Sequence, residues 1–175
     1  MAFSRDGELI ASASADNTVK LWNFNRDELL AHACSWMSDY LKNNPNLNEE
    51  KRNICGEVEP SATAWFLQGE HQAAQGNIEK AVSKFQQAVK LDPKFSLDSA
   101  ASLVRIGKSL VGSKQFEEAI AAFNQAQKFD NNVKITASDW NKLCWEGGVN
   151  KQAKKVMFAC NKAVELAPDN GWIYI

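Results

Sequence analysis

Residues 64–93 have the sequence AWFLQGEHQAAQGNIEKAVSKFQQAVKLDP, in which small and aromatic residues recur at helical spacing. Gly69 is followed, after eleven intervening residues, by Ala81, and then by Phe85 and Ala88. The same spacing returns 38 residues later, starting from Gly107. Self-similarity at an interval of about 20–50 residues is typical of architectures that stack one structural unit repeatedly. The sequence therefore predicts a series of stacked helix pairs.

A third copy, DWNKLCWEGGVNKQAKKVMFACNKAVELAP at residues 139–168, matches more weakly. Trp140 corresponds to Trp65, 75 residues earlier, but Val156 and Cys160 replace the small and the aromatic residue. Small residues let two helices approach closely, and the phenylalanines of the first two copies are expected to fill the space between units. We expect helices over residues 61–75, 78–91, 100–112, 116–129, 137–146 and 150–166.

The three copies resemble the tetratricopeptide repeat, whose unit has about 34 residues. The resemblance implies a mainly α protein, a superhelix of helix-turn-helix units with a concave face lined by the first helix of each unit. The copies follow one another at intervals of 38 and 37 residues. These intervals exceed 34 residues and imply insertions of about four and three residues at the junctions between units. Residues 61–170 would form an array of about three units, and residues 171–175 would begin a further, truncated one.

Glycines mark the expected turns of these units. We expect turns at Gly76-Asn77 and Gly112-Ser113, and we interpret Glu146-Gly147-Gly148 as a turn that ends a helix. The pair of glycines at 147 and 148 is not followed by the G-K-[ST] of a phosphate-binding loop. The sequence therefore predicts no nucleotide site.

The first 24 residues follow a different pattern. The turn signals Asp6-Gly7 and Asp16-Asn17 separate short runs, and the last of these alternates with period two. The expected antiparallel strands are Met1–Phe3, Leu9–Ser14 and Val19–Phe24.

The strings FSRDG, LIASAS and DNTVKLW closely resemble a blade of a WD-repeat β-propeller, with Arg5 where the family usually has proline. The resemblance implies that Asp16 is a buried turn aspartate bonded to nearby backbone amides and that Trp22 packs between blades. Because a propeller needs about 4–8 blades, we expect residues 1–24 to be a partial blade, and the chain a fragment of a longer propeller protein. A free-standing hairpin packed on the helices is the alternative.

Residues 25–60 are expected to form a helical tail and linker. Apolar residues at three- and four-residue intervals predict a helix over Asp27–Lys42, and Asn48 is the expected N-cap of a short helix that ends at Cys55. The string DELLAHACSWMSDYLKNNPNLNEEKRNICG resembles the segment that follows the last blade in many bacterial propeller proteins, notably cyanobacterial ones. Residues Glu57–Pro60 would be the linker.

The cysteines Cys34, Cys55, Cys144 and Cys160 are scattered, with no CxxC pair. We expect reduced thiols, as in a cytoplasmic protein, and no metal site, because no further ligand is suitably spaced. No apolar run approaches the ~18 residues of a membrane span. The sequence therefore predicts a cytoplasmic protein without a membrane partner.

Charge and composition exclude other classes of function. The chain has 20 Lys and Arg against 21 Asp and Glu, which lacks the strong positive field of a nucleic-acid binder. A hydrophobic content of 45% is sufficient for a buried core. The two histidines, His32 and His71, lie in different segments, and no catalytic triad or carboxylate pair is indicated. We expect no enzyme activity, no cofactor and no small-molecule substrate.

The resemblance to tetratricopeptide repeats implies a groove for a protein or peptide partner. The family's groove positions fall on Phe66, Glu70, Arg105, Lys108, Asn141, Lys142 and Trp145. The basic and amide side chains of this set, from Arg105 to Lys142, are predicted to hold an acidic peptide or a terminal carboxylate. Phe66 and Glu70 occupy the places where a clamp for chaperone tails needs a basic residue and an asparagine, so such a clamp is not expected.

The sequence thus favours a non-enzymatic protein–protein interaction scaffold that uses a tetratricopeptide groove and a propeller. The alternative is the sensor or scaffold portion of a larger signalling NTPase, protease or kinase, whose catalytic domain would lie upstream. An RNA-binding helical repeat is disfavoured, because basic side chains do not recur at matched groove positions.

Overall fold

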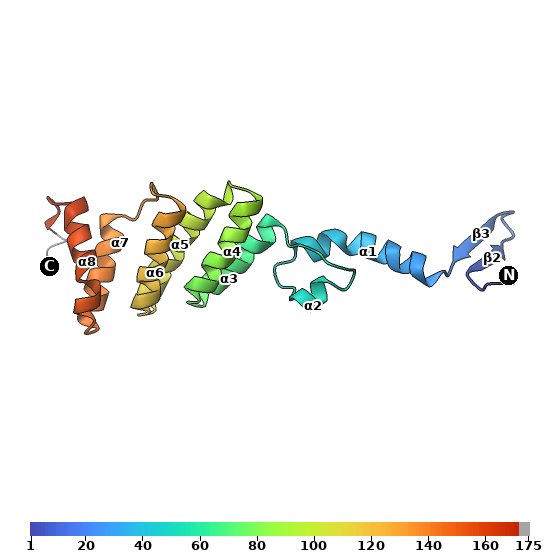
Figure 1. Ribbon diagram of the computed structural model, residues 1–175, viewed down its shortest axis with the longest axis horizontal. Helices are drawn as coiled ribbons and strands as arrows, with labels where there is room; N and C mark the ends of the chain where they lie inside the picture. Colours follow the sequence, from blue (N-terminus) through green and yellow to red (C-terminus); the bar gives the residue numbers. More distant parts are fainter. Residues whose placement is uncertain (172–175) are drawn as a thin grey trace. The chain divides into compact units, whose positions relative to one another are not determined.

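The computed structural model describes residues 1–171 and divides between Glu59 and Pro60 into two compact units (Figure 1). The described residues contain eight helices and a three-stranded sheet, so the chain is mainly α, as the sequence predicts. The expected start of a further repeat at residues 171–175 lies, apart from Gly171, outside the described residues.

The first unit begins with an antiparallel sheet in the order β1-β2-β3. Its strands are β1 (Ala2–Phe3), β2 (Leu9–Ala13) and β3 (Val19–Asn23), so the predicted meander is confirmed. Ile10 of β2 is paired with Phe3 on one side and with Trp22 on the other. Gly7 and Asn17 adopt positive φ in the two turns, a conformation that glycine and asparagine tolerate best.

The side chains of this sheet are mostly in contact with solvent. Phe3 is 71% exposed and Leu21 is 69% exposed. Of residues 1–59, only Leu41 and Arg52 are buried, and neither belongs to the sheet. The blade-like segment therefore has no hydrophobic core of its own within the first unit.

Helix α1 (Arg26–Asn43) follows the sheet, with the side chain of Asn25 accepting the N–H of Glu28 as its N-cap. The short helix α2 (Glu49–Arg52) begins at the predicted cap, Asn48. Its predicted continuation to Cys55 is wrong. The chain turns at Asn53, and Cys55 leaves the helix to form a disulfide with Cys34 of α1.

A buried arginine organises the loop between these two helices. Arg52 is 3% exposed, and its guanidinium donates hydrogen bonds to the carbonyl oxygens of Leu41 and Asn44, the latter at 2.9 Å. It also reaches the carbonyl oxygens of Lys42 and Leu47. The last backbone carbonyls of a helix have no N–H partner within the helix. The Arg52 side chain donates hydrogen bonds to these carbonyls at the end of α1.

The second unit consists of three helix pairs, each joined by a short turn (Figure 1). The helices are α3 (Ala62–Ala74), α4 (Ile78–Leu91), α5 (Phe95–Gly112), α6 (Phe116–Phe129), α7 (Ala137–Val149) and α8 (Ala153–Leu166). Helix α5 contacts α3, α4 and α7 in addition to its own partner α6. The pairs therefore stack in chain order, with the central pair between the other two.

Two glycines set the helix separation in the first two pairs. A Cβ on Gly69 would lie 2.6 Å from the ring of Phe85, and a Cβ on Gly107 would lie 2.6 Å from the ring of Phe123. Both rings are fully buried. Each ring also contacts the next pair, because Phe85 meets Phe129 edge-on and Phe123 meets a tryptophan of α7. The predicted role of this spacing is confirmed.

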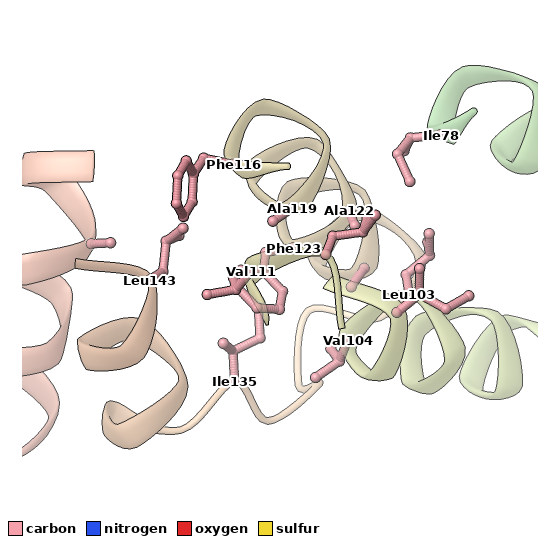
Figure 2. Close-up of a cluster of buried hydrophobic side chains, with 14 of the residues drawn as sticks. Ile78, Leu103, Val104, Val111, Phe116, Ala119, Ala122, Phe123, Ile135 and Leu143 are labelled. Atoms are coloured by element: carbon pink, nitrogen blue, oxygen red, sulfur yellow. The ribbon is translucent and has the colours of Figure 1, made fainter. Parts of the chain in front are cut away.

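Figure 2 shows the core around Phe123, whose labelled side chains come from helices α4 to α7 and from the loop before α7. Val104 and Val111 come from α5, and Leu143 comes from α7. Ile135, in the loop before α7, is also buried there. The loop between the second and third pairs is therefore part of the core rather than a loose insertion.

The junction between the first and second pairs differs from the expectation of a helix starting at residue 100. Helix α5 begins at Phe95 instead. The ring of Phe95 is nearly buried, with its centroid 5.2 Å from that of Phe66. The additional residues are thus absorbed as an extra turn of helix, which this aromatic contact stabilises.

The turns within the three pairs share one backbone conformation, and a glycine occupies it only in the first pair. Gly76, Lys114 and Lys151 have φ values of 82°, 63° and 62°. The expected turn at Gly112-Ser113 is shifted by one residue, because Gly112 is the last residue of α5, and Ser113 and Lys114 make the turn. A lysine takes this conformation at a cost that glycine avoids.

The expected helix end at Glu146-Gly147-Gly148 is wrong, since α7 continues to Val149. Gly147 is buried inside the helix, facing Val156 of α8. In the second pair the corresponding positions hold Leu110 and Ala119, both buried. In the second pair the first helix carries the large residue and the second helix the small one, and in the third pair this order is reversed. The total side-chain volume between the two helices therefore stays similar.

Candidate functional site

The predicted groove residues all lie on the first helices of the three pairs. Phe66 and Glu70 belong to α3, Arg105 and Lys108 belong to α5, and the remaining three belong to α7. Helix α5 contacts both α3 and α7. The three helices therefore form one continuous side of the second unit, which we call the α3-α5-α7 face.

An ion pair joins the first two helices of this face. Arg105 Nη2 lies 2.6 Å from Glu70 Oε1, and Ser102 Oγ donates a hydrogen bond of 2.7 Å to the same oxygen. Ser102 is buried, so part of this network is shielded from solvent. The network stabilises the contact between the first and second pairs and offsets the charge of Arg105 within the protein.

A second ion pair joins α5 to α7. Lys108 Nζ lies 2.9 Å from Asp139 Oδ2. The same carboxylate completes a capping box, in which Asp139 accepts from the backbone and hydroxyl of Thr136, and the Thr136 side chain accepts from the Asp139 N–H. Asp139 therefore both begins α7 and fixes α7 to α5.

The electrostatics of Asp139 follow from these contacts. Burial opposes ionisation of the carboxyl, but the hydrogen bonds from Lys108 and Thr136, together with the charge of Lys108, outweigh it. The pKa of Asp139 consequently lies below its usual value of 3.8. The Asp139 carboxyl is thus ionised at neutral pH.

Phe66 contributes mainly to packing. Its ring centroid lies 5.5 Å from that of Phe85 and 5.2 Å from that of Phe95. The side chain is only partly exposed and packs against the core of the second unit. Phe66 thus offers a partner less surface than its groove position implies.

The end of the face on α7 is more open. Trp145 is 53% exposed, Lys142 is exposed and Asn141 is partly exposed. Within residues 1–171, Lys142 makes no ion pair with an acidic side chain. The three basic side chains predicted to bind a ligand carboxylate therefore differ in their partners. Arg105 and Lys108 already pair with carboxylates of the protein, whereas Lys142 is available to bind one from a ligand.

Sequence reasoning missed Ser102 and Asp139. Asp139 could have been found, because an acidic residue three positions after Thr136 is a capping-box signal. Ser102 carries no comparable signal, since a serine inside a helix is common and its partner Glu70 lies 32 residues away.

The cysteines are paired, so the expectation of reduced thiols is wrong. Cys34 bonds to Cys55, with their Cα atoms 5.5 Å apart. Cys144 of α7 bonds to Cys160 of α8, with their Cα atoms 5.0 Å apart. Folding brings cysteines that are scattered in the sequence to bonding distance in both units.

In the blade-like segment, Asp16 Oδ1 accepts hydrogen bonds from the backbone N–H and the hydroxyl of Thr18. The hydroxyl contact, followed by the backbone one, lowers the pKa of Asp16. The predicted backbone bond is therefore confirmed, but the predicted burial is wrong, because Asp16 is exposed and no residue of the first unit covers it. Trp22 is half-exposed, and its Nε1 donates to Ser12 Oγ at 2.9 Å.

The structure also bears on metal binding and on membrane insertion. In the part of the chain that the structure describes, no group of three or more His, Cys, Asp or Glu residues is arranged to hold a metal ion. Across the same residues, none of the helices combines the length and the apolar character needed to cross a membrane.

Comparison with known families bears on both units. A family model described as WD domain, G-beta repeat matches residues 1–23. Two models described as tetratricopeptide repeat match residues 62–95 and 100–133. Helices α7 and α8 lie beyond these matched ranges, and a search of curated proteins gives no match to the chain. The chain therefore contains a WD-repeat segment followed by two tetratricopeptide repeats.

Proposed function

We propose that the chain is a non-enzymatic scaffold whose α3-α5-α7 face binds an extended segment of a partner protein. Tetratricopeptide and WD repeats mediate protein–protein interactions, which supports a protein partner. The observation that carries the proposal is the pair of salt bridges, Glu70–Arg105 and Lys108–Asp139, which link α3, α5 and α7 along one side.

These salt bridges affect what the face can bind. A ligand carboxylate that competed for Arg105 would have to displace Glu70 and leave that carboxylate without its partner, which is unfavourable for a partly buried group. Lys142, which forms no ion pair with an acidic side chain of residues 1–171, carries no such cost. We therefore assign recognition of an acidic group to Lys142 and Asn141, with Arg105 and Lys108 holding the helices in place.

Trp145 supplies the apolar part of the contact. Tryptophan is enriched among the residues that contribute most to protein interfaces, because a large ring loses much exposed surface on binding. Trp145 lies three residues after Lys142, so both side chains project from neighbouring positions on α7. The face thus suits a segment with an apolar side chain beside an acidic group.

The test is selection of peptides on the full chain from a random library, followed by affinity measurement with fluorescence anisotropy. We expect Trp145→Ala and Lys142→Ala each to weaken the selected peptides by about tenfold, the usual loss for a central contact. Lys154→Ala, an exposed lysine of α8, is the matched control and should leave affinity unchanged.

Peptides that bind both α7 variants as tightly as they bind the wild type would contradict the proposal. Cross-links from bound peptides to α4, α6 or α8 would contradict it as well, because these helices do not belong to the α3-α5-α7 face.

A further inference from the structure

The disulfide of the third helix pair occupies a specific position in the repeat. Cys144 and Cys160 are separated by 16 residues, the same separation as Gly69 from Phe85 and Gly107 from Phe123. The correspondence of Trp140 with Trp65, 75 residues earlier, also places Cys144 at the position of Gly69. The covalent bond therefore lies where the other two pairs pack a ring against a glycine.

The third pair has less packing at this position than the first two. In the first two pairs a phenylalanine ring fills the space over the glycine and is fully buried. Two cysteine side chains together are smaller than that ring, so without the bond α7 is held on α8 in this half by neighbouring contacts, such as the ring of Trp140 against that of Phe158. One turn further along, Gly147 and Val156 keep α7 and α8 in contact near their connecting turn.

The bond also differs from the packed rings in its exposure. Phe85 and Phe123 are fully buried, whereas Cys144 and Cys160 are both partly exposed. Thiol–disulfide exchange requires that a thiolate reach one of the two sulfur atoms. A dissolved thiol can therefore approach this bond, although no solvent reaches the equivalent position of the other pairs.

We propose that the Cys144–Cys160 bond is a reversible thiol–disulfide switch that controls the packing of α7 against α8. When the bond is closed, α7 is held on α8 along its length. When it is reduced, the half of α7 before Gly147 keeps only its non-covalent contacts, such as Trp140 with Phe158, and opens from α8 more often, carrying Lys142 and Trp145 with it. The binding consequence rests on the proposed function of these two side chains, whereas the change in packing does not.

The chemistry is a two-electron exchange with thiols of the glutathione class. One external thiolate attacks a sulfur of the Cys144–Cys160 bond to give a mixed disulfide, and a second external thiolate releases the protein thiol from it. The protein bond gains two electrons and two protons and becomes two thiols, while the two external thiols become one disulfide. Oxidation by a glutathione-class disulfide is the reverse.

The experiment measures amide hydrogen exchange of the full chain by mass spectrometry. Cys34→Ala/Cys55→Ala provides a background in which Cys144–Cys160 is the only bond that dithiothreitol can break. We expect reduction to accelerate exchange over residues 137–146 by at least about tenfold, and to leave α3 and α4 unchanged as the internal reference. Exchange over these residues should slow again when oxidised glutathione is supplied.

The double variant Cys144→Gly/Cys160→Phe restores the pairing found in the first two units and is the matched control. Its α7 should be protected equally with and without dithiothreitol. If this variant folds poorly, the test still rests on the Cys34→Ala/Cys55→Ala protein, in which exchange over residues 137–146 is compared with exchange over α3 and α4 before and after reduction.

Two results would overturn the proposal: unchanged exchange over residues 137–146 after confirmed reduction, or a bond that survives about 10 mM dithiothreitol in the folded protein. Neither result depends on a bound peptide. A failure of the proposed binding face would instead appear as unchanged peptide affinity in the Trp145 and Lys142 variants while the exchange response persists.

Discussion

Gly147 and Val156 are packed so closely that a Cβ on Gly147 would lie 2.5 Å from Val156 Cγ1 and 2.7 Å from its Cγ2. Adjacent Gly148, in contrast, has no atom within 4 Å of the place where its Cβ would be. Gly147 therefore has no room for a side chain, whereas Gly148 does, although the two are adjacent in the same helix.

Gly147→Ala should destabilise the second unit by about 1–3 kcal/mol, because Val156 has to move and overpacking of this size has that cost. Gly148→Ala should leave stability unchanged or raise it by up to about 1 kcal/mol, since alanine is the better helix former. Urea unfolding followed by helical circular dichroism measures both. Equal losses in the two variants would show that Gly147 does not mark the closest approach of α7 to α8.

Phe85→Ala and Phe123→Ala should each destabilise the second unit by about 3–5 kcal/mol, the usual cost of truncating a buried phenylalanine. Each ring is fully buried, packs on a glycine and contacts the following helix pair. Lys151→Ala, an exposed substitution in the turn before α8, should change stability by less than about 0.5 kcal/mol. A wild-type urea midpoint in both phenylalanine variants would remove the basis for the repeat alignment.

Two serines of α5 should respond in opposite directions. Ser99 is fully buried, and its hydroxyl has no hydrogen-bond partner among the described residues, so Ser99→Ala should stabilise the protein by about 1 kcal/mol. Ser102 donates to Glu70, so Ser102→Ala should destabilise it by about 0.5–1.5 kcal/mol. Thermal unfolding of the two variants side by side provides the comparison. A loss of stability in Ser99→Ala would mean that its hydroxyl has a partner in solution.

Asp139 should make stability depend on pH in acid. Its pKa is depressed in the folded state, so its contribution is fully present above the unfolded value near 3.8 and is lost as the pH falls through the lower folded value. The wild type should therefore exceed Asp139→Asn in urea midpoint at pH 7 and pH 5, and the difference should shrink as the pH falls below the usual value of 3.8. Glu165→Gln, an exposed substitution on α8, serves as the control. A difference that stayed constant down to pH 3 would contradict the ion pair with Lys108.

Local spacing was sufficient to predict the helix pairs and the packing of Gly69 on Phe85, because both depend on residues within one repeat. Predictions were wrong where a distant residue decides the outcome. Helix α5 starts early because Phe95 meets Phe66, and α7 continues through Gly147 because Val156 lies opposite. In the first case a distant ring extends a helix at its start, and in the second a contact in space overrides the local preference of glycine to end a helix.

The cysteines illustrate the same limit. Each was assessed by its neighbours in sequence, where no CxxC motif is present. The alignment of the repeats contained the missing information, since Cys144 and Cys160 fall on the two positions that touch in the first two pairs. The candidate site shows a similar division. The resemblance to tetratricopeptide repeats assigned Arg105 and Lys108 to the groove but could not show that Glu70 and Asp139 bind them.

The Cys34–Cys55 bond affects how the chain responds to tension. It lies between the last strand of the blade-like segment and the start of the repeats, and it spans a sequence separation of 21 residues. A pulling force applied at the two ends of the chain would pass through the bond and leave the enclosed loop, with its buried Arg52, unloaded. Breaking the bond would add about 70 Å of extended chain to the tether between the blade and the repeats.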